Sequence, residues 1–387
     1  MQTDWKVSNF VIRSQENYDS DCQNCSHGFK EFAVWNELES FNVIQNFSCD
    51  LMHDMLLGVL RYDMAFIINY LIKSKYFTLD RLNDKIKFLE FSKADAGSAM
   101  PQIKQEHMKK KIIIISASEM MSLILYFGIL VGDLVPEDDN VWKLYSLTTH
   151  ILENLLARSF TKLSIMYSQS LIEEHHELTS VLFQEHLRPK YYFLLHYPLI
   201  ITLLGPPRYF WSMRYESFHE LLKNTANSVT CRGNLLLTLS IKQQLRVSGR
   251  ILSKKGLTLP SNHGLRRSMS KSLLLGISYP FTENAKEVQW ICVENIHYRV
   301  GFALQLSTPD MVPRFGIIQY IVLDENNYYF VIFDINTVGF SSHLQCYVIA
   351  RGSQVVLEVH PLNSLEHKYF HNIHYAPSGI MAIYTTK

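Results

Sequence analysis

The spacing of apolar residues changes character about two-thirds of the way along this chain. Between residues 50 and 180, large apolar side chains recur every three or four positions, as Met52, Met55 and Leu56 do, and this spacing is typical of amphipathic α-helices. From Gly276 onward, apolar residues form short runs rich in β-branched and aromatic side chains, which favour strands. The sequence therefore predicts an α+β protein, with a mostly helical N-terminal two-thirds and a small C-terminal β-barrel.

Local signals place the individual helices. Ser116 followed by Glu119 is the signature of a capping box, and it precedes an apolar stretch at 120–131. His175 and His176 follow two glutamates, and adjacent residues point different ways on a helix, so we interpret them as part of a solvated face. Apolar spacing predicts helices at 50–71, 79–89, 120–131, 137–156, 163–178, 212–224 and 235–245, with a polar loop at 94–111.

The C-terminal third carries several strand-like runs separated by turn sequences such as Asp324–Asn327. Many short strands at this spacing suggest a small barrel of the SH3 or Tudor type. The runs are Glu287–Val293, Val300–Leu306, Arg314–Leu323, Tyr328–Asp334 and Cys346–Ile349. We expect the aromatic residues of this region to belong mostly to the barrel core, namely Tyr298, Phe302, Tyr320, Tyr328, Tyr329, Phe330 and Phe333.

Composition narrows the class of protein without identifying a partner. The chain has 387 residues, of which 47% are hydrophobic and 19% charged, as is ordinary for a globular protein. The formal net charge is +1, so any surface for nucleic acid must come from local clustering. The longest apolar run, Met120–Val131, is shorter than the roughly 20 residues that a bilayer requires. We see no secretory signal and expect no membrane partner.

The cysteines indicate a reducing compartment. They stand at positions 22, 25, 49, 231, 292 and 346, which is too sparse for a disulfide scaffold in a chain of this length. Cys22 and Cys25 have the spacing of half a zinc knuckle, but no second Cys-x-x-Cys completes it. We therefore expect free thiols and no zinc site.

Two segments far apart in the chain form a series of motifs. The first is Asp50-Leu51-Met52-His53-Asp54, and the second holds Leu187–Pro198 (LRPKYYFLLHYP), Gly205–Arg208 (GPPR) and Trp211–His219 (WSMRYESFH). Together, over roughly residues 10–250, they resemble the second half of the transposase of CACTA (En/Spm) DNA transposons, in its animal branch. The ordered series is more specific than any one of its motifs.

The resemblance implies a metal-dependent DDE site. In that family the Glu of the W-x-M-R-[FY]-E-x-x-H string is the last acid of the triad, and it corresponds here to Glu216. Such carboxylates hold two divalent ions, usually Mg²⁺, which activate water or a 3′-hydroxyl. Glu216 is then a metal ligand. Asp50 and His53 brace the site, and His219 shares a helix face with Glu216 because it lies at i+3.

These residues also have plainer structural interpretations. Asp50 is a favoured helix N-cap, since its carboxylate accepts hydrogen bonds from the first turn, and this is compatible with a bracing role. Glu216 and His219 fit the exposed surface of a helix equally well. A further alternative is an active nuclease in which Asp50 and Asp54 replace the family's other acids.

The family's first two catalytic Asp residues lie upstream of the point at which this chain begins. We therefore expect a truncated or domesticated copy, or a fragment of a longer gene, that lacks catalysis and exposes apolar surface near residues 190–220. The resemblance divides the first part of the chain into a remnant of an RNase H-like core at 1–49, a helical insertion at 50–185 and the end of that core with the last-acid helix at 186–247. Composition adds a basic linker at 248–275 and the β-barrel at 276–387.

Basic residues gather from Arg208 onward with few acids among them, which suits a DNA phosphate backbone. Lys254–Lys255 and Arg266–Arg267 also resemble a bipartite nuclear signal, so we expect a nuclear location. A solvated basic linker is the alternative. The predicted DNA contacts are Arg208, Arg214, Lys223, Arg232, Lys242 and Arg246.

Two classes of function remain open at this point. The first is a transposase-derived, DNA-associated protein without catalysis, which acts alone, with a second copy or with a complementing transposase chain. The second is a helical interaction scaffold whose C-terminal barrel binds a peptide or nucleic acid, and in which Glu216 has no role.

Overall fold

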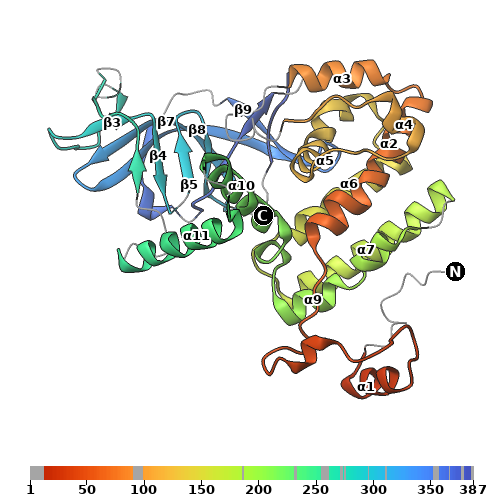
Figure 1. The fold of residues 1–387 in the computed structure, drawn as a ribbon. Coiled ribbons are helices and arrows are strands. Elements are labelled where there is room, and N and C mark those ends of the chain that lie inside the picture. Colours follow the sequence, from red (N-terminus) through yellow and green to blue (C-terminus); the bar gives the residue numbers. More distant parts are fainter. Residues whose placement is uncertain are drawn as a thin grey trace. The chain divides into compact units, whose positions relative to one another are not determined.

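Two units make up the fold, one built of helices and the other around a sheet (Figure 1). The computed structural model describes residues 13–89, 99–184, 187–230, 233–253, 261–270, 273, 276–294, 296–309, 312–351, 357–365, 367–375 and 379–384. The helical unit draws on Met1–Lys87 and Ser98–Ser217, and the sheet unit mainly on Phe218–Thr385. The predicted α+β class, with helices first and an antiparallel sheet last, is confirmed. The finer division into five domains stays a prediction.

The helical unit contains every helix that apolar spacing predicted before residue 180. The segments after Arg188 are also helical, because Pro189 and Pro198 occupy first-turn positions that need no backbone donor. The elements are α1 (Gln15–Gln23), η2 (Val34–Glu37), η3 (Met52–Val59), α2 (Leu60–Lys73), α3 (Leu79–Phe88), α4 (Gln105–Lys110), α5 (Ala117–Val131), η5 (Gly132–Leu134), α6 (Asn140–Leu155), α7 (Lys162–Phe183), α8 (Pro189–Leu194), α9 (Tyr197–Leu204), η6 (Pro207–Tyr209) and the start of α10 (Ser212–Ser228).

Two helices depart from the sequence prediction. Helix α4 lies inside the segment 94–111 that was expected to be a loop, and its Met108 is buried. The carbonyl of Met108 accepts a hydrogen bond from the Asn69 side chain, so contacts with α2 stabilise a helix that has little apolar periodicity of its own. Helix α1 was not predicted. Residues 90–98 lie outside the described part of the chain.

One long helix lies at the centre of the helical unit. It begins as a π-helix, η3, and continues as α2, and it contacts α4, α5, α6 and α8. Its predicted apolar stripe, which includes Met55 and Leu56, is fully buried. Gly58 permits the close approach of α8, because a Cβ atom there would lie 2.8 Å from the carbonyl oxygen of His53 and 3.1 Å from Cγ of Lys190.

Helices α5 and α6 complete the core beside this central helix. The predicted capping box is confirmed, since the Ser116 side chain accepts from the Glu119 N–H and Glu119 accepts from the Ser116 N–H. The buried hydroxyl of Tyr145 on α6 donates to the Ile124 carbonyl and accepts from the Gly128 N–H. This pair of bonds fixes α6 against the middle of α5.

Two stretches, Met52–Lys73 and Ala117–Leu134, are long and apolar enough to cross a membrane by length and composition alone. Within the protein, 61% and 72% of their most apolar windows are buried. Such burial is what the core helices of a globular protein show, and it is compatible with the expectation of no membrane partner.

The sheet unit includes helix α11 (Leu235–Leu252) before its first strand, and this helix is longer than the predicted helix at 235–245. Every strand pair is antiparallel. The main sheet has the order β11-β6-β7-β8-β9-β13-β12, with β10 beside β8 and β3 joining β2 to β7, and β1, β4 and β5 form a small separate sheet. The strands are β1 (Asn262–His263), β2 (Arg267–Ser268), β3 (Lys286–Val288), β4 (Trp290–Val293), β5 (Ile296–Arg299), β6 (Ala303–Ser307), β7 (Arg314–Asp324), β8 (Asn327–Ser341), β9 (Cys346–Arg351), β10 (Leu357–Pro361), β11 (Phe370–His371), β12 (Ile373–Tyr375) and β13 (Met381–Ile383).

Strands β7 and β8 form the spine of the sheet. They are joined by a tight turn in which Glu325 takes a φ of +54°, and Asp324 pairs with Asn327. Register shifts interrupt β7–β8 pairing near Ile318 and β8–β9 pairing near Thr337. Such irregularities increase strand bending, and the sheet curls into a half-barrel. The predicted core aromatics lie in its apolar clusters or pack against them.

Replacing Gly58 with alanine should lower the free energy of unfolding by about 1–3 kcal/mol, the usual cost of overpacking, because the new methyl group meets a backbone oxygen. Gly249→Ala in α11 is the matched control, since a Cβ there has no neighbour within 4 Å, and it should be neutral or stabilising by up to ~1 kcal/mol. Chemical denaturation of both variants measures this, and equal effects would show that a Cβ atom fits at position 58 without strain.

Candidate functional site

Asp50 caps two helices at once. One carboxylate oxygen accepts a hydrogen bond from the backbone N–H of His53 (3.2 Å), and the other accepts from the N–H of Ser212 (2.8 Å), the first residue of α10. The predicted N-cap role is confirmed, and the second cap was not foreseen. Burial alone would raise the pKa of Asp50, but the hydrogen bonds from Ser212 and His53 outweigh it and lower the pKa, because they stabilise the charged form.

His53 connects Asp50 with Glu216. Its Nδ1 atom hydrogen-bonds to the Asp50 carboxylate, while Nε2 lies 3.6 Å from Oε1 of Glu216 on α10. The second distance is beyond a hydrogen bond but within range of an ionic contact. The structure thus brings three of the four predicted site residues together. His219 is exposed one turn further along α10 and is not among the side chains that hydrogen-bond in this cluster.

This arrangement does not fit the Mg²⁺ ions that the resemblance implies. Mg²⁺ prefers several oxygen ligands around one point, whereas the carboxylates of Asp50 and Glu216 face opposite nitrogens of the same imidazole ring. Among the residues that the structure describes, no three His, Cys, Asp or Glu side chains are grouped as a metal site. We therefore derive no metal-dependent step. What the cluster does is fix an exposed imidazole and the start of α10.

Asp54, the other acid of the first motif, is almost completely buried and fully engaged. Its Oδ1 atom accepts a hydrogen bond from Lys190 Nζ (2.8 Å), and its Oδ2 atom accepts from the Asp50 N–H (3.0 Å) and from the Tyr197 hydroxyl (3.3 Å). Burial and then the charge of Asp54 raise the pKa of Tyr197. Asp54 therefore joins the central helix to α8 and α9.

A second polar cluster, which sequence analysis missed, lies fully buried further along the central helix. Asp63 accepts hydrogen bonds from the hydroxyl of Tyr191 on α8 and from Nε2 of His175 on α7, the latter at 2.8 Å. His176 contacts His175 through Nδ1 (3.1 Å) and the Tyr191 carbonyl oxygen through Nε2 (2.8 Å). The prediction that His175 and His176 form a solvated face is wrong, since neither is exposed at all.

The hydrogen bonds of this cluster define its protonation. Burial and then the charge of His175 lower the pKa of His176 to about 3, so His176 is neutral and donates from Nε2 to the Tyr191 carbonyl. Its Nδ1 atom is then an acceptor, and Nδ1 of His175 must donate. Nε2 of His175 lies 2.8 Å from Oδ2 of Asp63. This buried hydrogen bond joins α7 to α2.

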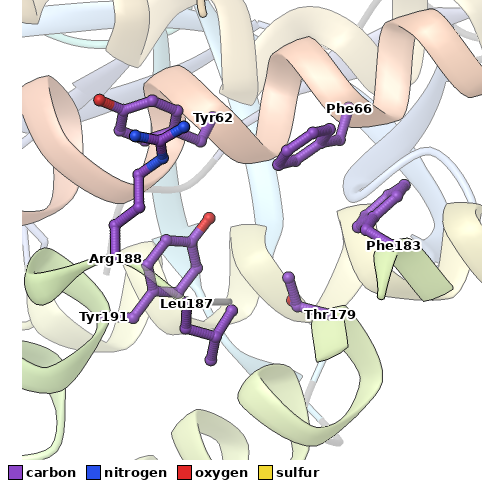
Figure 2. A pocket seen from close by; sticks show the side chains of 7 residues that line it. All are labelled: Tyr62, Phe66, Thr179, Phe183, Leu187, Arg188 and Tyr191. Carbon is purple, nitrogen blue, oxygen red and sulfur yellow. The ribbon is translucent and has the colours of Figure 1, made fainter. Parts of the chain in front are cut away.

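A small pocket lies beside this pair, and Figure 2 shows its lining side chains. The Arg188 guanidinium stacks on the Tyr62 ring at 4.2 Å, and Phe66 stacks on Phe183 at 4.8 Å. The cavity encloses about 10 Å³, which is room for roughly one water molecule. It is therefore too small to be the site of a larger ligand.

The predicted DNA-contacting residues have different environments. Arg214, Lys223, Lys242 and Arg246 are exposed on α10 and α11. Arg208 instead donates from Nη1 to the Leu156 carbonyl at the end of α6 (2.7 Å), which satisfies an orphan helix carbonyl. Arg208 therefore has a structural role in addition to any contact with DNA. Arg232 and Lys254–Lys255 lie outside the described residues.

Positive charge is concentrated where α6 ends. Burial lowers the pKa of Arg208, and the positive charge of Arg214 lowers it further. Arg158 lies two residues beyond Leu156, and burial and then the positive charge of Arg208 lower its pKa. The guanidinium group of Arg208 is therefore repelled by those of Arg158 and Arg214, and an anion at this surface would relieve that repulsion.

The apolar surface predicted near residues 190–220 is partly exposed. Tyr197 and Ile200 are buried, like much of α8 and α9. Other side chains of this stretch are open to solvent, namely Tyr192, Leu203, Leu204, Tyr209 and Tyr215. Near the N-terminus, Cys22 is buried while Cys25 is exposed, and both are free thiols.

Comparison with known proteins gave no relative. No family model, no curated protein and no solved structure matched the chain.

Asp50→Ala should lower the free energy of unfolding by about 2 kcal/mol, because two helix caps of about 1 kcal/mol each are removed. The pKa of Asp50 is lowered in the folded state. The stability difference between wild type and Asp50→Ala should therefore have its maximum value above the ordinary Asp pKa of about 3.9, and it should decrease as pH falls through the lower pKa of the folded state. Urea titrations across pH measure it. Asp84→Ala, at an exposed position on α3, should change little, and a pH-independent deficit in Asp50→Ala would argue against the capping account.

His175→Leu should lower the free energy of unfolding by about 1–3 kcal/mol, because it leaves the buried Asp63 side chain without one of its hydrogen-bond partners. The adjacent residue provides the control: Glu174 pairs with Lys143 on the surface, and Glu174→Gln should cost only about 0–1 kcal/mol. Thermal and chemical unfolding compare the two variants. A loss below ~1 kcal/mol in His175→Leu would show that the hydrogen bond to Asp63 contributes little to stability.

Proposed function

We propose that this protein is a DNA-associated protein derived from a DDE-type transposase of the CACTA kind. The observation that carries the proposal is the contact of His53 with Glu216. The Asp50–His53 motif and the Glu216 motif resemble the same family, and the fold brings them into one cluster. Two unrelated surface motifs would have no reason to meet.

In this proposal the cluster positions a binding helix and does not cut DNA. Asp50 fixes the first residue of α10, and His53 contacts the carboxylate of Glu216 one turn later. Helix α10 then presents the exposed side chains of Arg214 and Lys223 to a phosphate backbone. The like-charged group of Arg158, Arg208 and Arg214 supports an anionic partner, and Lys242 and Arg246 add exposed basic side chains on α11.

The finer fold assignments belong to the same proposal. The elements from η3 to α7 correspond to the helical insertion at 50–185, and those from α8 through most of α11 to the end of an RNase H-like core at 186–247. The cap that Asp50 supplies to α10, the helix with the family's last acid, supports this division. The curled antiparallel sheet supports a small SH3- or Tudor-like barrel, and a DNA partner places the protein in the nucleus.

Salt-dependent binding of the purified chain to duplex DNA, with Mg²⁺ or Mn²⁺ present and nicking scored in the same samples, tests the proposal. We expect affinity to fall steeply with salt, without nicking. Arg214→Ala with Lys223→Ala should weaken binding to all sequences and reduce the salt slope by about one for each phosphate group that the variant no longer neutralises.

Lys109→Ala, an exposed substitution on α4, is the control and should leave the affinity unchanged. Absence of binding would refute the DNA role and favour the interaction scaffold. Nicking that disappears in Glu216→Ala would show instead that the protein is an active nuclease.

A further inference from the structure

Helix α11 carries a broad uncharged face that is exposed to solvent. No residue of α11 is buried. Leu235 and Leu239 are partly exposed, and seven other large aliphatic side chains are 41–81% exposed. At about 3.6 residues per turn, these side chains share one half of the helix with Ser240, Gln244 and Ser248, while Lys242 and Arg246 fall on the other half. The aliphatic residues are Leu236, Leu237, Ile241, Leu245, Val247, Ile251 and Leu252.

The composition of this face is symmetric about Gln244. Positions at equal distances on either side of Gln244 carry similar residues: Ile241 corresponds to Val247, and Leu237 corresponds to Ile251. The same count matches further pairs, namely Ser240 with Ser248, Leu236 with Leu252 and, on the opposite half, Lys242 with Arg246. Leu245, at the edge of the face, has no such counterpart. A helix with this pattern presents nearly the same face when it is turned end over end.

Charge decides which partner fits. Helix α11 contains no acidic residue, and its cations lie on the half opposite the aliphatic face. DNA or an acidic protein would meet the cations and leave the aliphatic side chains in water. A membrane-surface helix usually anchors with Trp or Phe, and α11 has no aromatic residue. The occupant that matches is an uncharged aliphatic surface of the same length.

We propose that the aliphatic face of α11 is a dimer interface with a second copy of this chain, packed antiparallel about a two-fold axis at Gln244. Ile241 then faces the second copy's Val247, and Leu237 faces its Ile251, so that apolar side chains cover each other as a self-complementary interface requires. The two Gln244 amides, each a donor and an acceptor, meet at the axis. The cations point outward. The inference does not depend on DNA binding.

Cross-linking of the full-length protein tests the axis. In a Cys25→Ser background, which removes the exposed thiol among the described residues, Gln244→Cys should form a disulfide-linked dimer under mild oxidation. Lys242→Cys, on the opposite half of the same helix, should remain mostly monomeric, and the parent Cys25→Ser protein gives the background. Equal cross-linking of the two variants would overturn the proposal.

Sedimentation measures the interface itself. Ile241→Asp should raise the dimer dissociation constant by roughly tenfold or more, since about 1.4 kcal/mol gives each factor of ten, and Arg246→Gln should leave it unchanged. Below the dissociation constant, Ile241→Asp should not alter the melting temperature, because the side chain is exposed in the monomer. A wild-type chain that stays monomeric, a melting temperature lowered by Ile241→Asp, or binding to anionic vesicles that Ile241→Asp abolishes would each overturn the proposal.

Discussion

Acidic side chains along one central helix connect it to segments that come more than a hundred residues later. Asp50 caps α10, Asp54 pairs with Lys190 of α8, and Asp63 pairs with His175 of α7. The apolar stripe of the same helix supplies burial, but burial has no direction. The carboxylates supply direction, because each accepts hydrogen bonds from particular donors on particular helices.

The directional hydrogen bonds to these carboxylates explain why the central helix can contain buried acids. An isolated buried carboxylate is strongly destabilising, yet Asp63 has His175 and Tyr191 as hydrogen-bond partners, and Asp54 has Lys190 and Tyr197. Losing one partner is then costly, while the complete set specifies which helices pack where. Of the three acids, Asp63 and Asp54 are buried, whereas the cluster at Asp50 reaches the surface. The Asp50 cluster is therefore the part that a partner can contact.

Much of the fold follows from patterns within about twenty residues. Local spacing is enough to predict helices α5 and α6, the N-cap at Asp50, and strands β7 and β8. The buried state of His175 cannot be predicted in this way, because its partner Asp63 lies 112 residues away and the surrounding run of Glu and His looks solvated. Arg208 likewise has a contact that local sequence does not reveal. Its basic side chain predicted a DNA contact, whereas its hydrogen bond to the Leu156 carbonyl depends on where α6 ends.

A double-mutant cycle between Asp63 and Tyr191 measures directly whether these carboxylates hold distant segments together. The two residues are 128 positions apart and share a buried hydrogen bond. Asp63→Asn, Tyr191→Phe and the double variant would be compared by their free energies of unfolding. The account predicts a coupling of about 0.5–3 kcal/mol. Effects that add to within ~0.3–0.5 kcal/mol, as they do for independent sites, would contradict it.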